Sequence, residues 1–370
     1  MGVGPRALEG LEVTPDFWAG RRVFLTGHTG FKGAWMAALL SHLGADVTGY
    51  ALAPETEPNL WTLLELKNVR SVVGDLNDRA KLDQALAEAR PEVVLHLAAQ
   101  ALVRRSYRNP VETFASNVMG TVQLLDAVRG CADVRAVVVA TSDKAYDNVE
   151  QIWGYRECDP MGGRDPYSAS KGACEIAAQS MAKSFFMPHA LGGHPARVAT
   201  VRAGNVIGGG DWSEDRLVPD IVRGCLGDAG LVTLRAPNSV RPWQHVLEPL
   251  RGYLMVAERL ANGDDAAASG WNFGPDRQDE HPVITLAEAV VAALGRGRIV
   301  IDDQGASLHE AKILRLDCTK ARVELGWQPV LRFADCVRLT AAWYAGWAAG
   351  RPAAELCREQ ILTCEGILKQ

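Results

Sequence analysis

Short apolar, β-branched runs alternate with segments of helical periodicity through the N-terminal half of the chain. The apolar runs lie at 23–26, 46–52, 71–73, 93–97 and 136–140. The segments of helical periodicity lie between them, at 34–43, 79–88 and 110–129. A continuous apolar run of strand length is typical of a strand buried on both faces of a sheet. Strands that alternate with helices predict an α/β fold with a doubly wound, parallel sheet of the Rossmann type.

The pattern becomes irregular after a predicted helix at 168–186 and a further strand at 198–201. A loop-like stretch follows at 203–212. Later strands are expected at 231–235, 271–273 and 299–301, and later helices at 248–261, 286–294 and 333–349, the last of the chain. This mixture favours a smaller C-terminal α/β lobe, built onto the sheet, that binds a substrate.

Composition narrows the class of protein. The 370 residues are 48% hydrophobic, enough for a substantial core, and the formal net charge of -5 gives no basic field for nucleic acid. No apolar run approaches the roughly 18 residues of a membrane span, and the N-terminus lacks the apolar segment of a signal peptide. The eight cysteines are scattered without a CxxC pair, as reduced thiols are. We therefore expect a soluble cytoplasmic protein, and we predict no metal site.

A glycine-rich turn joins the first predicted strand to its helix. Its residues are Gly27, His28, Thr29, Gly30, Phe31, Lys32 and Gly33. Glycines let the backbone approach a pyrophosphate, while the helix N-terminus supplies free N–H groups and partial positive charge. We predict a dinucleotide site at this turn; the alternative is a glycine turn without a ligand.

The second predicted strand bears on the choice between NAD and NADP. No acidic residue lies at the end of this strand, although a carboxylate that binds the ribose is expected about 20 residues after the glycines. His28 and Lys32 could contact a 2′-phosphate, yet no arginine follows the strand. We therefore favour NAD over NADP.

Asp75 and Leu76 directly follow the third predicted strand. At this edge of the sheet they could contact an adenine ring. The alternative for Asp75 is to cap the N-terminus of the next helix.

Small and polar residues near the fourth predicted strand extend the same site. Ala98 and Ala99 behind the strand leave room for a dinucleotide to lie across the backbone. Asn117 is an interior polar residue of the helix at 110–129. Because a buried amide needs partners, Asn117 contacts either the backbone of a neighbouring turn or the cofactor site.

Candidate catalytic residues follow the fifth predicted strand and begin the next helix. Ser142, Asp143 and Lys144 lie just beyond the strand's carboxyl end, where ligands bind in open α/β sheets. The spacing of four between Tyr167 and Lys171 puts both side chains on one face of a helix. A neighbouring cation stabilises a phenolate and lowers a pKa that starts near ~10. Such a tyrosine can act as general base for a hydroxyl.

An arginine and a tryptophan lie close together later in the chain, at Arg241 and Trp243. The fork of a guanidinium matches the oxygens of a diphosphate, so Arg241 is a candidate ligand for one. The alternative is a surface arginine beside a packed tryptophan.

These motifs resemble those of a known superfamily. The glycine spacing, Tyr167-x-x-x-Lys171 and the upstream Ser142 resemble the extended short-chain dehydrogenases/reductases. The resemblance to one branch, the CDP-glucose 4,6-dehydratases, runs from about Phe17 to the predicted last helix, on the segments HTGFKG, LVRRSY, PVETFASNVMGT, TSDKAY, GGRDPYSASK, RAGNVIGGGDW and RPWQHVLEPL. Related dehydratases carry glutamate where this chain has Lys144, and the CDP-glucose branch carries lysine there.

The resemblance implies a full set of ligands and partners. NAD would be held by the glycine turn together with Asp75, Leu76, Ala98, Ala99, Gln100, Asn117, Tyr167 and Lys171. CDP-glucose would be held by Ser106, Asn205, Arg216, Arg241 and His245. The resemblance also implies a homodimer or homotetramer, without nucleic-acid or membrane partners. We accordingly expect an N-terminal arm over 1–20, an NAD-binding Rossmann domain over 21–203, and mainly a substrate-binding lobe over 204–370, with some segments returning to the first domain.

The expected reaction uses both groups of catalytic residues. Tyr167, assisted by Lys171 and Ser142, would take the C4 hydroxyl proton as hydride passes to NAD. Asp143 would then act as acid for the leaving C6 hydroxyl and Lys144 as base at C5, unless these two form only a surface ion pair. The rival enzyme is a nucleotide-sugar 4-epimerase, which needs no acid and base at C5 and C6. A non-catalytic NAD-binding protein is the third interpretation, although it need not retain Ser142, Tyr167 and Lys171.

Overall fold

The computed structural model describes residues 13–186, 193–302 and 313–369. The first part of the predicted N-terminal arm, residues 1–12, lies outside these ranges. The remainder is packed: helix α1 (Pro15–Trp18) buries Trp18, whose indole N–H donates to Glu258 Oε1 over 2.6 Å. Thr14 donates its backbone N–H to the same carboxylate over 2.9 Å. These contacts anchor residues 14–18 to the rest of the fold.

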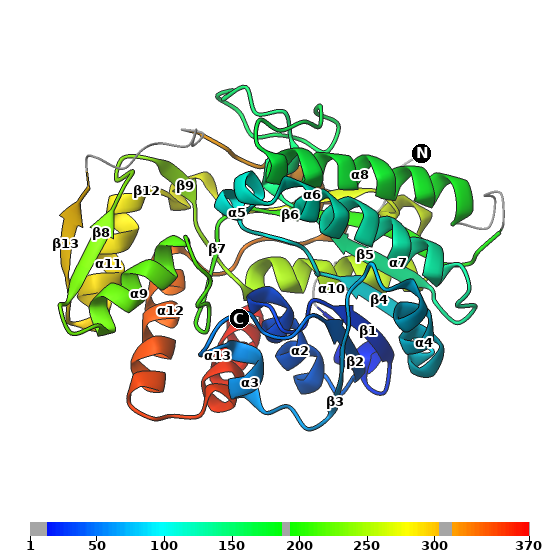
Figure 1. Ribbon diagram of the computed structural model, residues 1–370, viewed down its shortest axis with the longest axis horizontal. Helices are drawn as coiled ribbons and strands as arrows, with labels where there is room; N and C mark the ends of the chain where they lie inside the picture. The colour runs from blue at the N-terminus through cyan, green and yellow to red at the C-terminus, as the bar shows by residue number, and fades with distance from the viewer. Residues whose placement is uncertain (1–12, 187–192, 303–312, 370) are drawn as a thin grey trace, which may run out of the picture.

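A seven-stranded sheet forms the centre of the molecule (Figure 1). Its strands are β1 (Arg22–Thr26), β2 (Asp46–Ala51), β3 (Val69–Val73), β4 (Val93–His96), β5 (Ala136–Ala140), β6 (Arg197–Ala203) and β11 (Gly270–Phe273). Their order is β11-β6-β5-β4-β1-β2-β3, and every neighbouring pair is parallel. The predicted doubly wound parallel sheet is confirmed.

Helices cover both faces of the sheet. On one side are α4 (Arg79–Ala89), α7 (Gly120–Val128) and α8 (Pro166–Phe185), and on the other are α2 (Phe31–His42) and α10 (Leu247–Ala261) (Figure 1). Alternate strand residues enter separate cores: Phe24 and Val137 pack with the first group, and Leu25 and Val138 with the second. Burial on both faces explains why the strands are apolar runs without polar alternation.

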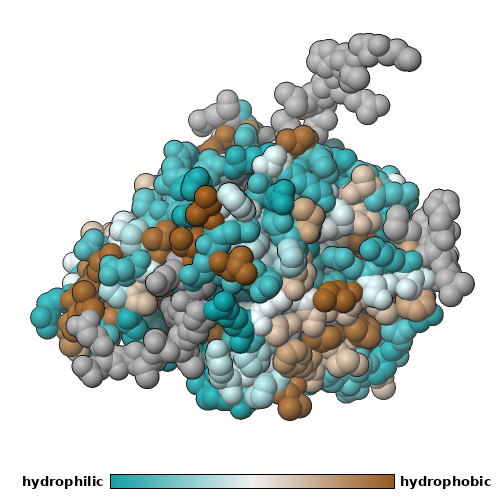
Figure 2. All heavy atoms as spheres, turned by 90° about the horizontal axis from the view of Figure 1, so that it is seen from above, coloured by the Kyte–Doolittle hydropathy of each residue, from teal (hydrophilic) through white to brown (hydrophobic). Residues whose placement is uncertain are grey.

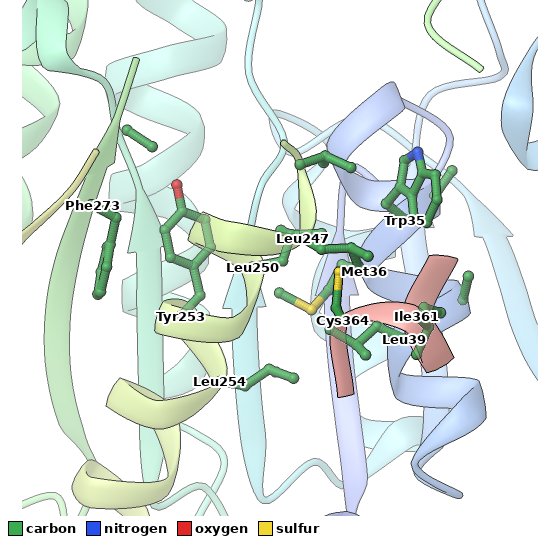
Figure 3. Close-up of a cluster of buried hydrophobic side chains, with 14 of the residues drawn as sticks. Trp35, Met36, Leu39, Leu247, Leu250, Tyr253, Leu254, Phe273, Ile361 and Cys364 are labelled. Atoms are coloured by element: carbon green, nitrogen blue, oxygen red, sulfur yellow. The ribbon is translucent and has the colours of Figure 1, made fainter. Parts of the chain in front are cut away.

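Helix α10 is the centre of the larger core (Figure 3). Its buried side chains lie between β11 on one side and helices α2 and α13 (Ala353–Leu368) on the other. The residues drawn there include Trp35, Met36, Leu39, Leu247, Leu250, Tyr253, Leu254, Phe273, Ile361 and Cys364. This packing holds the second half of the chain firmly against the Rossmann sheet.

The predicted last helix of the chain is α12 (Phe333–Ala348), but α13 follows it after a short turn. The prediction missed α13 because its buried stripe is not uniformly apolar. Gln360 lies within the stripe, where its amide bonds to His245 and to the carbonyl of Leu339. A polar residue satisfied by tertiary contacts weakens the periodic pattern from which helices are predicted.

The C-terminal lobe combines short strand pairs with helices. The pairs are β8 (Leu231–Leu234) with β13 (Arg298–Ile301), β9 (Val240–Pro242) with β12 (Glu280–Pro282), and β7 (Val206–Ile207) with β10 (Gln244–His245). Helices α9 (Leu217–Leu226), α11 (Val283–Leu294) and α12 complete it. The stretch 203–212, expected to be a loop, thus contains strand β7.

The predicted helix at 110–129 is continuous but changes its winding. It consists of α6 (Pro110–Phe114), a π-helical turn (Ala115–Met119) and α7. Single π-helical turns occur frequently at functional sites.

Two short helices, α3 (Leu60–Leu64) and α5 (Val103–Arg108), were not expected, because each is too short to show a clear period. None of the described helices is long and apolar enough to cross a lipid bilayer.

Three buried histidines predict a loss of stability in mild acid. Burial lowers the pKa of His28 to about 4, of His96 to about 3 and of His245 to about 4, from an ordinary 6.5. The unfolded chain therefore binds more protons than the native state below about pH 6.5, so stability present above 6.5 is lost as the pH falls toward 4. Each histidine contributes a slope of at most about 1.4 kcal/mol per pH unit.

Urea unfolding at several pH values between 7 and about 5 measures this slope. The His96→Gln variant removes one titrating group, so its free energy of unfolding should fall less steeply than that of the wild type. Equal slopes for the two proteins would show that His96 titrates normally in the native state.

Candidate active site

Helix α8 presents Tyr167 and Lys171 to the carboxyl edge of the sheet. Asp165 caps the helix by accepting from the N–H of Ser168 over 2.9 Å, and Pro166 occupies the first turn. Both Tyr167 and Lys171 are buried. The Lys171 ammonium donates to the carbonyl of Ala140 over 3.3 Å, which joins the helix to the end of strand β5.

The segment after β5 brings the other predicted catalytic residues to the same place. Ser142 caps a 3₁₀ turn (Asp143–Ala145) by accepting from the N–H of Lys144 over 3.2 Å. Its hydroxyl donates to Asp143 Oδ1 over 2.9 Å and lies near enough to the phenol of Tyr167 to act on its pKa. Ser142 and Asp143 are buried, and Lys144 is half-buried. The fold therefore brings Tyr167, Ser142 and Asp143 together.

The electrostatics of Tyr167 differ from the expectation. Burial raises the pKa of Tyr167 to about 12, although its hydrogen bond to Ser142 and the charge of Arg216 act to lower it. Burial also lowers the pKa of Lys171, which weakens the cation that was expected to stabilise the phenolate. The expected lowering of the phenol pKa is therefore wrong for the protein alone, because desolvation outweighs the neighbouring charges.

Two cations from distant parts of the chain act on the catalytic residues. Lys32, in the glycine turn, and Arg216, at the N-terminus of α9, interact electrostatically with each other and with the catalytic residues. The pKa of Lys32 is lowered to about 8, mainly by burial and also by the charges of Arg216 and Lys171, while the charge of Asp143 acts to raise it. This concentration of positive charge near the catalytic residues suits a phosphorylated ligand.

The glycine turn needs glycine for two different reasons. Gly27 has a φ of +77°, and a Cβ there would lie 2.6 Å from the backbone nitrogen of Ala98. A Cβ on Gly33 would lie 2.0 Å from the carbonyl oxygen of Gly27. At Gly30, the N-cap of α2, a Cβ would meet only the carbonyl of Gly27, at 3.4 Å. The helix N-terminus is therefore accessible, and the turn fits the predicted dinucleotide pyrophosphate.

The other residues of the turn hold it in place. His28 shares a hydrogen bond of 2.7 Å with the hydroxyl of Ser71, and its ring lies edge-on to Trp61. Thr29 donates to the carbonyl of Leu52 over 2.9 Å. Phe31 packs on the larger core. The side chains of His28 and Thr29 are occupied by these contacts within the chain. The backbone N–H groups are therefore the main groups of the turn that can hold a cofactor.

Asp75 does not cap helix α4, so that alternative is wrong. Its carboxylate accepts from the backbone N–H of Asn77 over 2.9 Å, whereas Asp78 caps the helix by accepting from Lys81 over 3.2 Å. Leu76 is buried in the core beside the sheet. The adenine contact stays a prediction for both residues.

The side chain of Asn117 joins three elements. It accepts from the N–H of Gln100 over 2.8 Å, donates to the carbonyl of Gln100 over 3.0 Å and donates to the hydroxyl of Ser170 over 2.8 Å. Of the two partners considered for Asn117, the backbone of a neighbouring turn is the one observed. The amide holds the half-buried segment with Ala98 and Ala99 against helix α8, so it supports the cofactor site from behind.

Two residues predicted to bind substrate have structural partners instead. Ser106 is buried and accepts from the N–H of Tyr167 over 3.1 Å, so it orients the start of α8. His245 is buried in the core, where its ring nitrogens contact Gln360 over 3.1 Å and the N–H of Leu247 over 3.4 Å. A substrate contact by His245 is not compatible with this position, because both nitrogens are used within the protein.

The remaining substrate predictions concern Asn205, Arg216 and Arg241, which are half-buried. Asn205 has a left-handed backbone, with φ 39°, directly after strand β6. The Arg216 guanidinium lies 3.5 Å from the Asp211 carboxylate, and its charge acts to lower the pKa of both Tyr167 and Lys32. Arg241 donates to the carbonyl of Val240 over 2.9 Å. Of the three, Arg216 has the clearest link to the catalytic residues.

Sequence reasoning missed a buried ion pair behind the catalytic residues, between Glu175 and Arg202. A signal was available, because Glu175 follows Lys171 by one helical turn and so lies on the same face of α8.

A small cavity of about 10 Å³ is lined by Asp143, Gly204 and Gln244, among others. A larger cavity of about 370 Å³ lies elsewhere, between α2, α10 and α13, and contains none of the predicted catalytic residues.

The chain is similar to several characterised families of sugar-nucleotide enzymes. Residues 24–340 match the family model described as GDP-mannose 4,6 dehydratase. A CDP-glucose 4,6-dehydratase of Salmonella typhimurium is 47% identical over 339 residues, which cover 91% of this chain and 94% of that protein. A dTDP-glucose 4,6-dehydratase of Xanthomonas campestris pv. campestris is 26% identical over 306 residues, which cover 77% of this chain and 82% of that protein.

Solved structures with the same fold include a UDP-glucose 4-epimerase of Thermotoga maritima, solved with UDP-glucose. Its TM-score is 0.74 at 22% identity, with 88% of this chain and 99% of that chain covered. A dTDP-glucose 4,6-dehydratase of Streptomyces venezuelae, solved with NAD bound, has a TM-score of 0.72 at 24% identity, with 90% of this chain and 99% of that chain covered. At these identities the likeness shows the fold alone.

Proposed function

The chain belongs to the nucleotide-sugar 4,6-dehydratase family, and from this membership we propose that it converts CDP-glucose to CDP-4-keto-6-deoxyglucose and water, as a hydro-lyase that uses NAD. The 47% identity to a CDP-glucose 4,6-dehydratase, over 91% of the chain, supports the choice of substrate. The observation that carries the chemistry is the buried contact of Tyr167 with Ser142 and of Ser142 with Asp143. This contact supports Tyr167 as the base for the C4 hydroxyl and Asp143 as the acid for the C6 hydroxyl.

Oxidation at C4 begins with a proton transfer to Tyr167. Its phenolate takes the C4 hydroxyl proton, with Ser142 as the hydrogen-bond partner that holds both oxygens. NAD held at the glycine turn would supply the acceptor for the C4 hydride and the donor of hydride to C6. Burial raises the pKa of Tyr167 to about 12, and the charge of Arg216 acts in the opposite direction and favours the ionised form.

Elimination follows once C4 is a ketone, because the ketone acidifies the C5 proton. Lys144 takes that proton, and Asp143 donates a proton to the C6 hydroxyl. The C5–H and C6–O bonds break, water leaves, and a C5–C6 double bond forms. Return of hydride to C6 and of a proton to C5 gives the 4-keto-6-deoxy sugar, so the whole cycle has no net change in oxidation state.

A direct test is incubation of the purified protein with CDP-glucose, UDP-glucose and dTDP-glucose. We expect a 4-keto product, measured by its absorbance in alkali, from CDP-glucose in preference to the other two. A 4-epimerised sugar nucleotide without a 4-keto product would identify an epimerase instead. Protection by NAD against thermal unfolding, with no effect and no product from any sugar nucleotide, would identify a non-catalytic NAD-binding protein.

We also propose that two chains pair through the helices α6, α7 and α8. The face that these helices form carries exposed apolar side chains, including Val111 (82% exposed), Met119 (51%) and Ile176 (63%). Figure 2 looks onto this side of the molecule and shows apolar side chains gathered in patches. Large exposed apolar patches on a folded protein mark association surfaces. A homodimer is the simplest assembly that covers this face, and a homotetramer would contain two such pairs.

The Ile176→Glu variant is expected to be a monomer, because a charge at the centre of an apolar interface must be desolvated on association. Sedimentation or light scattering measures the mass. Val323→Glu is the matched control, since Val323 is 78% exposed in a turn beside strand β11, outside these three helices, and the change should leave the assembly unchanged. A wild-type monomer, or an unaltered mass for Ile176→Glu, would contradict the proposed interface.

A further inference from the structure

A completely buried ion pair lies directly behind the catalytic residues. Glu175 on helix α8 and Arg202 on strand β6 are both 0% exposed. Two parallel hydrogen bonds join them, from Arg202 Nε to Oε1 over 2.7 Å and from Nη2 to Oε2 over 2.9 Å. Because removal of two charges from water is expensive, such a pair is weak evidence for stability and invites a search for another role.

The pair holds both ends of the Ser142–Lys144 segment. On one side, Glu175 accepts a hydrogen bond from the hydroxyl of Thr141, the residue before Ser142. On the other side, Arg202 donates to the hydroxyl of Tyr146, which follows Lys144 by two residues. Tyr146 in turn donates to Asn272 Oδ1 on strand β11 over 2.8 Å.

The same pair also connects this segment to the catalytic helix. Glu175 lies one turn after Lys171 on the buried face of α8, and its charge acts on the Lys171 ammonium. The distance between the Tyr167 phenol and the Asp143 carboxylate is therefore governed by one rigid unit that spans α8, β6 and β11. Elimination depends on this distance more than hydride transfer does, since elimination needs an acid and a base placed at C6 and C5 together.

We propose that Thr141, Tyr146, Glu175 and Arg202 form a positioning unit that holds Asp143 and Lys144 in place for the elimination step. None of the four touches the reacting atoms. This role rests on the proposed dehydratase reaction. Disruption of the unit should leave oxidation at C4 intact and slow the later loss of water.

The test compares two buried tyrosines in a single turnover with CDP-glucose and NAD. Tyr146→Phe removes the hydroxyl that bonds to Arg202 and Asn272 but keeps the ring, which stacks on Tyr155 at 5.2 Å. Tyr155→Phe is the matched control: its hydroxyl also makes two hydrogen bonds, with Val149 and Asn148, but these lie outside the unit. Thermal unfolding of both variants measures the purely structural cost.

We expect Tyr146→Phe to form reduced nicotinamide at close to the wild-type rate and then to form the 4-keto-6-deoxy product about tenfold or more slowly. Reduced nicotinamide should therefore accumulate in this variant and not in Tyr155→Phe. Equal slowing of both steps, or equal effects in the two variants, would overturn the positioning role. A wild-type protein that yields neither reduced nicotinamide nor product would instead overturn the proposed function, so the two failures are distinguishable.

Thr141 offers an independent check at the other end of the segment. Thr141→Val removes the hydrogen bond to Glu175 at nearly constant volume and should slow turnover about tenfold. Thr141→Ser keeps the hydroxyl and should restore turnover to within about threefold of the wild type. Equal turnover of the valine and serine variants would contradict the proposal even if Tyr146→Phe failed to fold.

Discussion

The Tyr167→Phe variant is expected to lose the first step of the reaction, with a fall in turnover of about 10²- to 10⁴-fold, the range typical of a general base. The phenol is the proposed acceptor of the C4 proton, and the charge of Arg216 favours its ionised form. Phenylalanine keeps the ring in the same buried space. The fall in turnover should therefore come from the missing hydroxyl and not from a large change in stability.

A single turnover with CDP-glucose and NAD measures this effect directly. The near-ultraviolet absorbance of reduced nicotinamide should appear transiently in the wild type and be absent in Tyr167→Phe. Tyr155→Phe, which also loses a buried hydroxyl but lies away from α8, should behave as the wild type does. Normal formation of reduced nicotinamide by Tyr167→Phe would remove Tyr167 from the oxidation step.

The Asp143→Asn variant is expected to fail at a later point. Oxidation at C4 should proceed, and product formation should fall by about 10²- to 10⁴-fold, because an amide cannot protonate the leaving C6 hydroxyl. Asparagine suits the tight site: a Cβ on Gly204 would lie 2.0 Å from Asp143 Oδ2, so the carboxylate is closely packed. The amide oxygen can still accept from Ser142, which should keep its position for the first step.

Reduced nicotinamide should therefore accumulate in Asp143→Asn without 4-keto-6-deoxy product, and the affinities for NAD and CDP-glucose should be unchanged. Asp147→Asn, an exposed change in the same loop, is the control and should leave turnover unaltered. Undiminished turnover of Asp143→Asn would remove Asp143 from the mechanism. A failure of both steps would show that the carboxylate is needed to organise Ser142.

Much of the fold was predictable because its signals are local. The β-branched strand runs and the glycine turn each need only neighbouring residues, and the confirmed parallel sheet follows from their alternation with helices. Helix α13 escaped prediction because Gln360 is satisfied by His245 and the carbonyl of Leu339, which come from other parts of the chain. For the same reason His245 looked like a ligand residue in sequence and proved to be a core residue.

The sequence by itself determined the kinds of chemistry available: a tyrosine and a lysine one turn apart, a hydroxyl with an acid and an amine after a strand, and glycines before a helix. The tertiary structure decided which of these groups meet, and in what environment. Only the folded chain brings Glu175 to Arg202 and Lys32 to Asp143, and only burial makes the Tyr167 phenol a weaker acid than its neighbours suggest. Spacing along a chain fixes nearby contacts, whereas charge pairing and desolvation depend on segments that are distant in sequence.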